Sequence, residues 1–285
     1  MKDFKDTFFY KKKTSYTGGK LIYFDKPAVM GIVNCTPDSF YDGGKNNTLD
    51  TAIKLIEEMV AAGVDMIDIG GYSSRPQSID ISTEEEIARV IPIIHETRKH
   101  FPELLISIDT FRSEVAQSAI HHGASMVNDI SGGTLDSHMF DVVAKAQVPY
   151  IMMHMKGTPQ TMITQAHYSN VLDEVIQFFI AQIEKAKKAG IRDIILDPGF
   201  GFAKNTEQNY ELLKHLDVFK LFELPLLIGA SRKSMIYKTL HINASEALNG
   251  TSIINTLALQ QGVSILRVHD VKEAKEVVTL IQMIQ

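Results

Sequence analysis

The stretch "TLDTAIKLIEEMVAAGVDMIDIGG", residues 48–71, holds one complete helix–turn–strand unit and decides how the rest of the chain is interpreted. Its first half places Ile53, Ile56 and Val60 on one face at helical spacing, which predicts an amphipathic helix. Gly63 follows, and glycine commonly ends a helix because it adopts left-handed conformations without steric cost. Three residues later "MIDIGG" begins, an apolar run without alternation, which is typical of a strand covered on both faces.

The same pattern recurs along the chain. Gly63, Gly123, Gly190 and Gly262 each lie three residues before the start of an apolar run. Other helix starts are marked by capping-box spacing, Ser82 with Glu85 and Asn205 with Gln208. The runs predicted as strands are residues 29–34, 66–71, 104–110, 126–132, 150–155, 193–199, 224–231 and 265–270.

Eight strand–helix units with no linker between them predict an α/β fold, a (β/α)8 TIM barrel in a single domain at residues 29–285. Residues 1–28, with the turn "YTGGK", are predicted to form a hairpin-like extension that plugs or flanks the lower end of the barrel. The alternative is a doubly wound open sheet. It needs a glycine-rich phosphate loop after the first strand, and "NCTPDSFYDGG" is a poor match to one.

Composition limits the classes of function. The chain has 285 residues, 45% of them hydrophobic and 22% charged, and a net charge of −5, which is globular and gives no support to nucleic-acid binding. Cys35 is the single cysteine, so no internal disulfide can form and a reducing compartment is expected. The first residues lack a signal-peptide core, and no run reaches the roughly 18 apolar residues of a membrane span. These features predict a soluble cytoplasmic protein without membrane or nucleic-acid partners.

Polar residues gather where the predicted strands end. One such residue is usually a helix cap or a loop hydrogen bond, but a complete ring is difficult to explain structurally, and barrel active sites lie at this end. Three of its members, Asp109, Asn128 and Asp197, are acceptors and suit a heterocycle with several N–H donors. Lys233, Arg267 and His269, with Arg75 from a neighbouring loop, are cationic or can be, and suit phosphate or carboxylate oxygens. The ring consists of Asn34, Asp68, Asp109, Asn128, His154, Asp197, Ser231, Arg232, Lys233, Arg267 and His269.

Two loops on the same face are long and rich in glycine, proline or serine. "CTPDSFYDGGKNN" follows the first strand and carries Phe40, and "YSSRPQSID" follows the second and carries Arg75. Long loops on the working face of a barrel commonly act as lids, so we expect these two to close over a substrate.

The chain resembles the dihydropteroate synthase family, the folate-pathway transferases that sulfonamides target. The matching stretches are "GIVNCTPDSFYDGG", "IDIGGYSSRP", "ISIDTFRSEVA", "VNDISGG", "MMHMKGTP", "DPGFGFAKN", "GASRKSMI" and "LRVHDV", in family order over about residues 29 to 271. The sequences of these motifs are most similar to those of Bacteroidetes-type bacterial members of the family. The resemblance implies condensation of 6-hydroxymethyl-7,8-dihydropterin diphosphate with p-aminobenzoate, giving 7,8-dihydropteroate and diphosphate, by a homodimer that uses Mg²⁺.

The resemblance also implies roles for individual residues. Asp109, Lys233, Arg267 and His269 would be catalytic, and Asn34 would contact the metal. The ring of the pterin would be held by Asp109, Asn128, Asp197 and Lys233, with Met153 against it. Diphosphate oxygens would be bound by Ser74, Arg267 and His269. The p-aminobenzoate side would be formed by Phe40, Arg75, Pro76, Phe202 and Ser234, with Asp42 in the first loop.

Departures from the family pattern are small. The second loop reads "GGYSSRP" where many members have "GGESTRP", so Ser74 keeps a hydroxyl and loses a methyl group. A metal-dependent hydrolase on the same barrel would place clustered histidines after the first strand, where this chain has "VNC". A pterin-dependent methyltransferase and a non-catalytic pterin-binding homologue remain as alternatives. The presence of Asn34, Lys233 and His269 disfavours the second of them.

Overall fold

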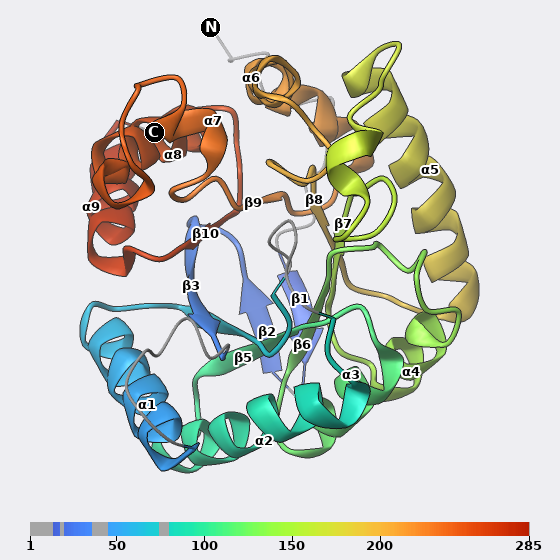
Figure 1. Ribbon diagram of the computed structural model, residues 1–285, viewed down its shortest axis with the longest axis vertical. Helices are drawn as coiled ribbons and strands as arrows, with labels where there is room; N and C mark the ends of the chain where they lie inside the picture. The colour runs from blue at the N-terminus through green and yellow to red at the C-terminus, as the bar shows by residue number, and fades with distance from the viewer. Residues whose placement is uncertain (1–13, 18–19, 36–44, 74–79, 285) are drawn as a thin grey trace, which may run out of the picture.

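The computed structural model describes residues 14–17, 20–35, 45–73 and 80–284. Within these ranges no helix is both long and apolar enough to cross a membrane. The strands stand in the middle of the molecule and the helices surround them (Figure 1).

Eight parallel strands form one sheet, in the order β8-β7-β6-β5-β4-β3-β10-β9. A parallel bridge between Leu196 and Leu226 joins the two ends of this order, so the sheet curls into a nearly closed barrel. The predicted (β/α)8 barrel is therefore confirmed, and every predicted run contains a strand. The strands are β3 Ala28–Asn34, β4 Met66–Gly70, β5 Leu105–Asp109, β6 Met126–Asp129, β7 Tyr150–Met153, β8 Ile194–Asp197, β9 Leu227–Ile228 and β10 Ile265–Val268.

Helices follow the strands around the outside of the barrel. They are α1 Lys45–Ala61, α2 Thr83–His100, α3 Ser113–His121, α4 Met139–Ala146, α5 Val171–Ala189, α6 Thr206–Lys214, α7 Ser234–Tyr237, α8 Leu248–Gln260 and α9 Val271–Gln282. Short 3₁₀ turns lie at Met162–Gln165, Leu216–Phe222 and Ala244–Glu246.

Local signals in the sequence explain where the helices begin and end. Gly190 caps α5 with φ at 99°, and the other three predicted glycines also have positive φ angles. Asn205 begins α6 with a complete capping box to Gln208. Ser82 begins α2 and accepts a hydrogen bond from the backbone N–H of Glu85.

Two apolar layers build the core. Residues of the strands that face outward pack against the helices, as Ile67, Ile108 and Leu196 do. Residues that face inward at the N-terminal ends of the strands close the lower end of the barrel, with Met66 and Ile195 among them.

The N-terminal residues complete the lower core. Strands β1 Thr14–Thr17 and β2 Lys20–Tyr23 pair antiparallel, and Ile22 and Phe24 pack into the lower layer. In the described part of residues 1–28, the hairpin-like extension therefore has its predicted form and place. The division into an extension at 1–28 and a barrel at 29–285 stays a prediction.

Candidate active site

Strand alternation directs polar side chains into the upper mouth of the barrel. In β8, Ile195 packs in the lower core, so Asp197, two residues later, points inward near the strand's other end. Met66 and Asp68 stand in the same relation in β4, and Arg267 is inward-facing in β10. The side chains that face into the barrel therefore change from apolar to polar toward the C-terminal ends of the strands.

A network of ion pairs and hydrogen bonds joins four strands, β4, β5, β6 and β10. The guanidinium of Arg267 donates from Nε to Asp68 Oδ2 at 2.6 Å and from Nη2 to Asp109 Oδ2 at 2.7 Å. Asn128 donates from Nδ2 to the same Asp68 oxygen at 2.8 Å. The side chain of Asp68 is fully buried, while Arg267 and Asp109 are 17% and 19% exposed. These residues are therefore pre-organised before any substrate binds.

Burial raises the pKa of Asp109 to about 7. The Arg267 guanidinium opposes this shift, and the Asp68 carboxylate adds to it because two nearby carboxylates disfavour each other's charge. Asp109 therefore changes its charge close to neutral pH, the range in which a functional group at an active site is most responsive.

Asp197 and Lys233 lie on either side of a tight turn. Asp197 Oδ1 accepts a hydrogen bond from the backbone N–H of Gly199 at 2.8 Å. Lys233 donates from Nζ to the carbonyl of Phe200, and its ammonium lies 4.5 Å from the centre of the Phe202 ring. Burial raises the pKa of Asp197 and lowers the pKa of Lys233 to about 8, with Asp197 opposing the second shift.

We expect a narrow bell-shaped pH profile for kcat/KM, because the roles predicted for Asp109 and Lys233 require an ionised carboxylate and a protonated amine. Activity should rise with pH as the Asp109 carboxyl loses its proton near 7 and should fall as Lys233 loses its proton near 8. Initial rates between pH 5 and 10 check this. In Lys233→Arg, whose guanidinium stays charged, the alkaline limb should move out of the measured range, and a limb that stays in place would assign it to another group.

His269 and Ser231 form a second polar pair at the mouth. His269 Nδ1 lies 3.1 Å from Ser231 Oγ. Burial, together with the positive charge of Arg267, lowers the pKa of His269 to about 4, so its imidazole is neutral near pH 7. Arg232, which the sequence places in the ring, instead binds Asp270 with two hydrogen bonds of 2.8 and 2.7 Å. Arg232 therefore links the turn before α7 to the start of α9.

An apolar wall borders the polar mouth. Met153 at the end of β7 packs with Ile130 and Met162, and the half-buried rings of Phe111 and Phe202 lie against this cluster. Met153 and Phe202 are thus brought together, as the predicted pterin and p-aminobenzoate contacts require. A flat aromatic ligand would find an apolar face beside hydrogen-bonding groups.

Of the remaining predicted site residues, the structure describes two and leaves five outside the described ranges. Asn34 ends β3 and is partly exposed, in register with Gly70 of β4. Ser234 begins α7 directly after Lys233 and is also partly exposed. The other five predicted contacts lie outside the described residues, so their places in the site stay predictions; they are Phe40, Asp42, Ser74, Arg75 and Pro76.

Sequence reasoning gave no role to two buried groups of the site. Asp68 was in the ring of strand-end residues, but nothing in its local sequence showed that it binds Arg267. Lys204 is 8% exposed and donates to the carbonyls of Gly199 and Phe202 at 3.0 Å and to His154 Nδ1 at 2.9 Å. Its place in "GFAKN", directly after the turn, was the available signal.

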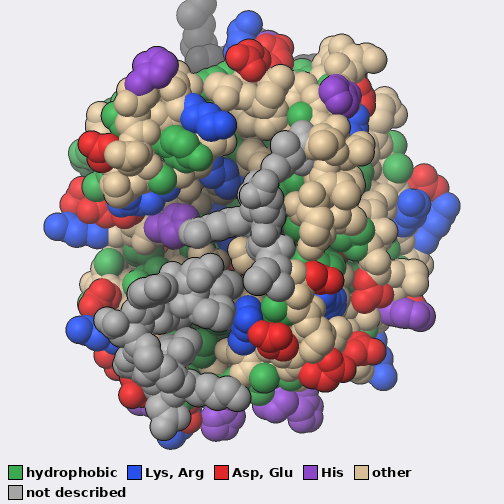
Figure 2. Space-filling view, in the orientation of Figure 1, with side chains coloured by type: hydrophobic (Ala, Val, Ile, Leu, Met, Phe, Trp, Pro, Cys, Tyr) green, Lys and Arg blue, Asp and Glu red, His purple; other side chains and the backbone are tan. Residues whose placement is uncertain are grey.

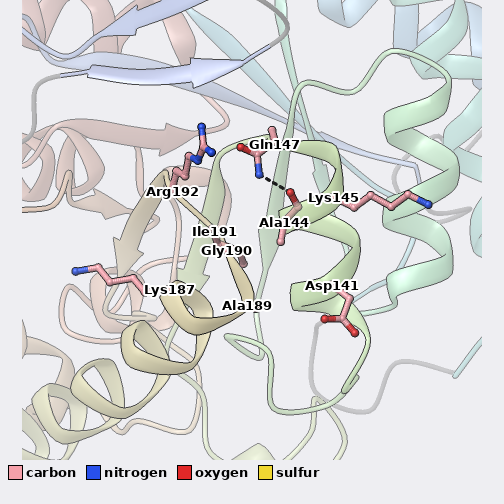
Figure 3. Close-up of a pocket in the computed structure, with 9 residues that line it drawn as sticks. All are labelled: Asp141, Ala144, Lys145, Gln147, Lys187, Ala189, Gly190, Ile191 and Arg192. Atoms are coloured by element: carbon pink, nitrogen blue, oxygen red, sulfur yellow. Dashed lines mark hydrogen bonds between the residues drawn. The ribbon is translucent and has the colours of Figure 1, made fainter.

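A groove of about 750 Å³ lies elsewhere on the molecule. Its lining comes from the ends of α4 and α5 and the loops that lead into β7 and β8, including Gln147, Gly190 and Arg192 (Figure 3). These loops are at the N-terminal ends of the strands, opposite the polar mouth, so this groove is separate from the candidate active site.

Several known proteins are similar to this chain. The profile of the pterin-binding enzyme family matches residues 30–269. The dihydropteroate synthase of Escherichia coli K12 is 42% identical over 94% of this chain and 95% of its own length. The chain belongs to the dihydropteroate synthase family.

Solved structures of dihydropteroate synthases have the same fold. The Yersinia pestis enzyme, solved with a sulfonamide drug complex, is 38% identical and superposes with a TM-score of 0.90, covering 95% of this chain and 98% of that one. The Xanthomonas albilineans enzyme, solved with 4-aminobenzoic acid, is 38% identical with a TM-score of 0.89, covering 96% and 98%. The resemblance inferred from the eight motifs is thereby confirmed.

The described part of the chain has no cluster of three or more His, Cys, Asp or Glu that would hold a metal by protein ligands alone. Mg²⁺ takes oxygen ligands and usually keeps waters, so one or two protein oxygens plus substrate phosphates are enough. The partly exposed amide of Asn34 at the end of β3 would supply such an oxygen. The donor set therefore fits a magnesium ion held mainly by substrate.

Proposed function

We propose that the polar mouth of this barrel condenses 6-hydroxymethyl-7,8-dihydropterin diphosphate with p-aminobenzoate. The observation that carries the proposal is the convergence of Asp109, Asn128, Asp197 and Lys233 on one mouth, next to Arg267. These groups match the two halves of the first substrate, an N–H-rich heterocycle and an anionic leaving group.

The pterin's amino-pyrimidinone edge presents adjacent N–H donors and a carbonyl. Asp197 accepts from the donors and Lys233 donates to the ring carbonyl or a ring nitrogen. Because Gly199 holds one oxygen of Asp197 and Phe200 holds Lys233, both groups are oriented before the substrate arrives. Little conformational entropy is then lost on binding.

The reaction breaks the bond between the pterin methylene carbon and a diphosphate oxygen. The electron pair leaves with the diphosphate, and the dihydropterin ring donates electrons to the methylene, so an SN1-like path is favoured. The Asp109 carboxylate stabilises the resulting cation, while Arg267 and His269 stabilise the departing diphosphate. The p-aminobenzoate nitrogen then attacks the methylene carbon and releases a proton to water.

Magnesium is part of the proposal. Asn34 would hold it, and the ion would supply positive charge to the diphosphate oxygens. Arg267 uses Nε and Nη2 in its two ion pairs, so Nη1 is the nitrogen that these pairs leave for a phosphate oxygen. His269 is neutral near pH 7 and donates a hydrogen bond only from its protonated ring nitrogen.

The experiment is diphosphate release measured with dihydropterin diphosphate, p-aminobenzoate and Mg²⁺, and with each component omitted in turn. Release that needs all three, with dihydropteroate formed, supports the proposal. Release without p-aminobenzoate would mean that water captures the cation. Tight pterin binding without release would favour the pterin-dependent methyltransferase or the non-catalytic homologue. We also propose that the protein carries out this reaction in the cytoplasm.

We further propose that the protein is a homodimer that associates through α8 and α9. Large apolar side chains are exposed on these two helices, with Ile253 at 52% and Leu257 at 42% on one face of α8 and Leu280 at 69% on α9. Helices α8 and α9 pack side by side, and in Figure 2 scattered hydrophobic side chains lie among charged and polar ones on the side of the molecule where Figure 1 places these helices. Exposed apolar patches of this kind mark protein interfaces.

Ile253→Glu should convert the dimer to a monomer, because a charge at the centre of an apolar interface loses its hydration without gaining a partner. Sedimentation velocity of the wild type and the variant measures this. Ile180→Glu on α5, where the wild-type residue is 46% exposed, is the matched control and should leave the mass unchanged. A monomeric wild type, or a dimeric Ile253→Glu variant, would contradict the proposed interface.

A further inference from the structure

We propose that Asp68 is a positioning residue of this active site, whose carboxylate holds Arg267 and Asn128 in the orientations that the substrate requires. The proposal rests on the proposed function, because those two residues matter only if they contact the pterin diphosphate. Neither the sequence motifs nor the resemblance assigned Asp68 a role.

The geometry of Asp68 carries the inference. One oxygen, Oδ2, accepts both from Arg267 at 2.6 Å and from Asn128 at 2.8 Å. In the sheet β4 lies between the two partners, separated from β6 by β5 and from β10 by β3. Asp68 therefore ties together residues that are 199 and 60 positions away along the chain.

The carboxylate is expensive to bury, which argues against a packing role. Asp68 is 0% exposed, and among the described residues its second oxygen, Oδ1, has no hydrogen-bond donor. The hydroxyl of Ser107, its partner in register on β5, is also buried without a partner there. The inward residue two positions earlier in β4 is the apolar Met66. A charge retained at such a cost is explained by what it orients.

Asp68 also affects the charge of a neighbouring carboxylate. Asp68 and Asp109 share Arg267, and the first raises the pKa of the second. Replacement of Asp68 by a neutral residue leaves Arg267 and Asp109 as a balanced pair, so the protein should still fold. The charged groups that act on Asp109 are Arg267 from β10, Asp68 from β4, Glu86 from α2, Asp129 from β6 and Lys233 before α7.

The test is Asp68→Asn, which keeps the shape and removes the charge. We expect kcat/KM for dihydropterin diphosphate at pH 8 to fall about 10- to 100-fold, as for lost hydrogen bonds to charged groups, with the loss mainly in KM. The KM for p-aminobenzoate should stay unchanged. The acid limb, set by Asp109, should move to lower pH by about one unit, because a close like charge has been removed.

Two comparisons make the outcome decisive. Asp65→Asn removes a carboxylate that binds Lys275 and the backbone of Val29 outside the mouth, and it should leave the limb in place. If Asp68→Asn is not folded by circular dichroism, Asp68→Ser repeats the test. An unmoved acid limb with an unchanged pterin KM would overturn the proposal, as would an equal shift in Asp65→Asn. Wild-type turnover, measured first, separates failure of this inference from failure of the proposed function.

Discussion

Asp197→Asn should lower the affinity for the pterin substrate by about 10- to 100-fold or more, since a hydrogen bond to a charged group contributes roughly 1.5–3 kcal/mol. Asp197 offers acceptors at the buried end of β8, whereas asparagine replaces one acceptor with an NH₂ donor that would face a pterin N–H. Calorimetric binding of the dihydropterin diphosphate, without p-aminobenzoate, measures the effect directly.

The control for this prediction is Asp136→Asn. Asp136 also accepts from backbone N–H groups, those of Ser113 and His138, but it belongs to the loop that leads into α4. That variant should lose some stability and keep its pterin affinity. Equal losses in the two variants would show that Asp197 acts through the stability of the barrel, and an unchanged affinity in Asp197→Asn would remove it from the pterin site.

Gly199→Ala should both destabilise the protein and inactivate it. Gly199 has φ at +73°, and a Cβ atom there would lie 2.1 Å from the carbonyl oxygen of His154, a contact with rigid backbone. The left-handed conformation alone costs roughly 1–2 kcal/mol for a non-glycine residue, and displacement of the turn adds to that cost. Denaturant titration measures the stability. Activity should fall as well, because the turn holds Asp197 and Lys233.

Gly63→Ala separates the conformational cost of a positive φ angle from the steric cost of the contact with His154. Gly63 also has a positive φ, +82°, but its nearest neighbour to an added Cβ is the flexible Lys275 side chain at 3.8 Å. This variant should show only the conformational cost and keep its activity. If both variants lose the same free energy of unfolding, the close approach to His154 contributes nothing and the steric argument is wrong.

Most of the fold could be predicted because its signals are local. The four glycines that end helices, the capping residues Ser82 and Asn205, and the near-continuous apolar runs each act within a few residues. Strand ends were predicted one to three residues too long in several cases, as at 126–132 against Met126–Asp129. The periodicity of apolar residues alone cannot show at which residue the hydrogen bonds between two strands stop.

The candidate site, like the fold, could be predicted from the sequence only in part. The residue types at the strand ends, with Asp109, Asn128, Asp197 and Arg267 in family order, were visible in the sequence because the barrel brings every strand end to one mouth. Their partners were not visible. Arg267 binds Asp109 across 158 positions, and Lys233 binds the carbonyl of Phe200 across 33.

The sequence by itself therefore determined the barrel, the mouth at which its polar groups meet and the family to which it belongs, because these depend on local periodicity and on short motifs. Only the tertiary structure decided which groups are paired, which are buried and which change charge near neutral pH. Burial and the nearby Asp68 carboxylate raise the pKa of Asp109 against the effect of Arg267, through distances that only folding creates. Those quantities have no local signature, because the strands that supply them are adjacent only in space.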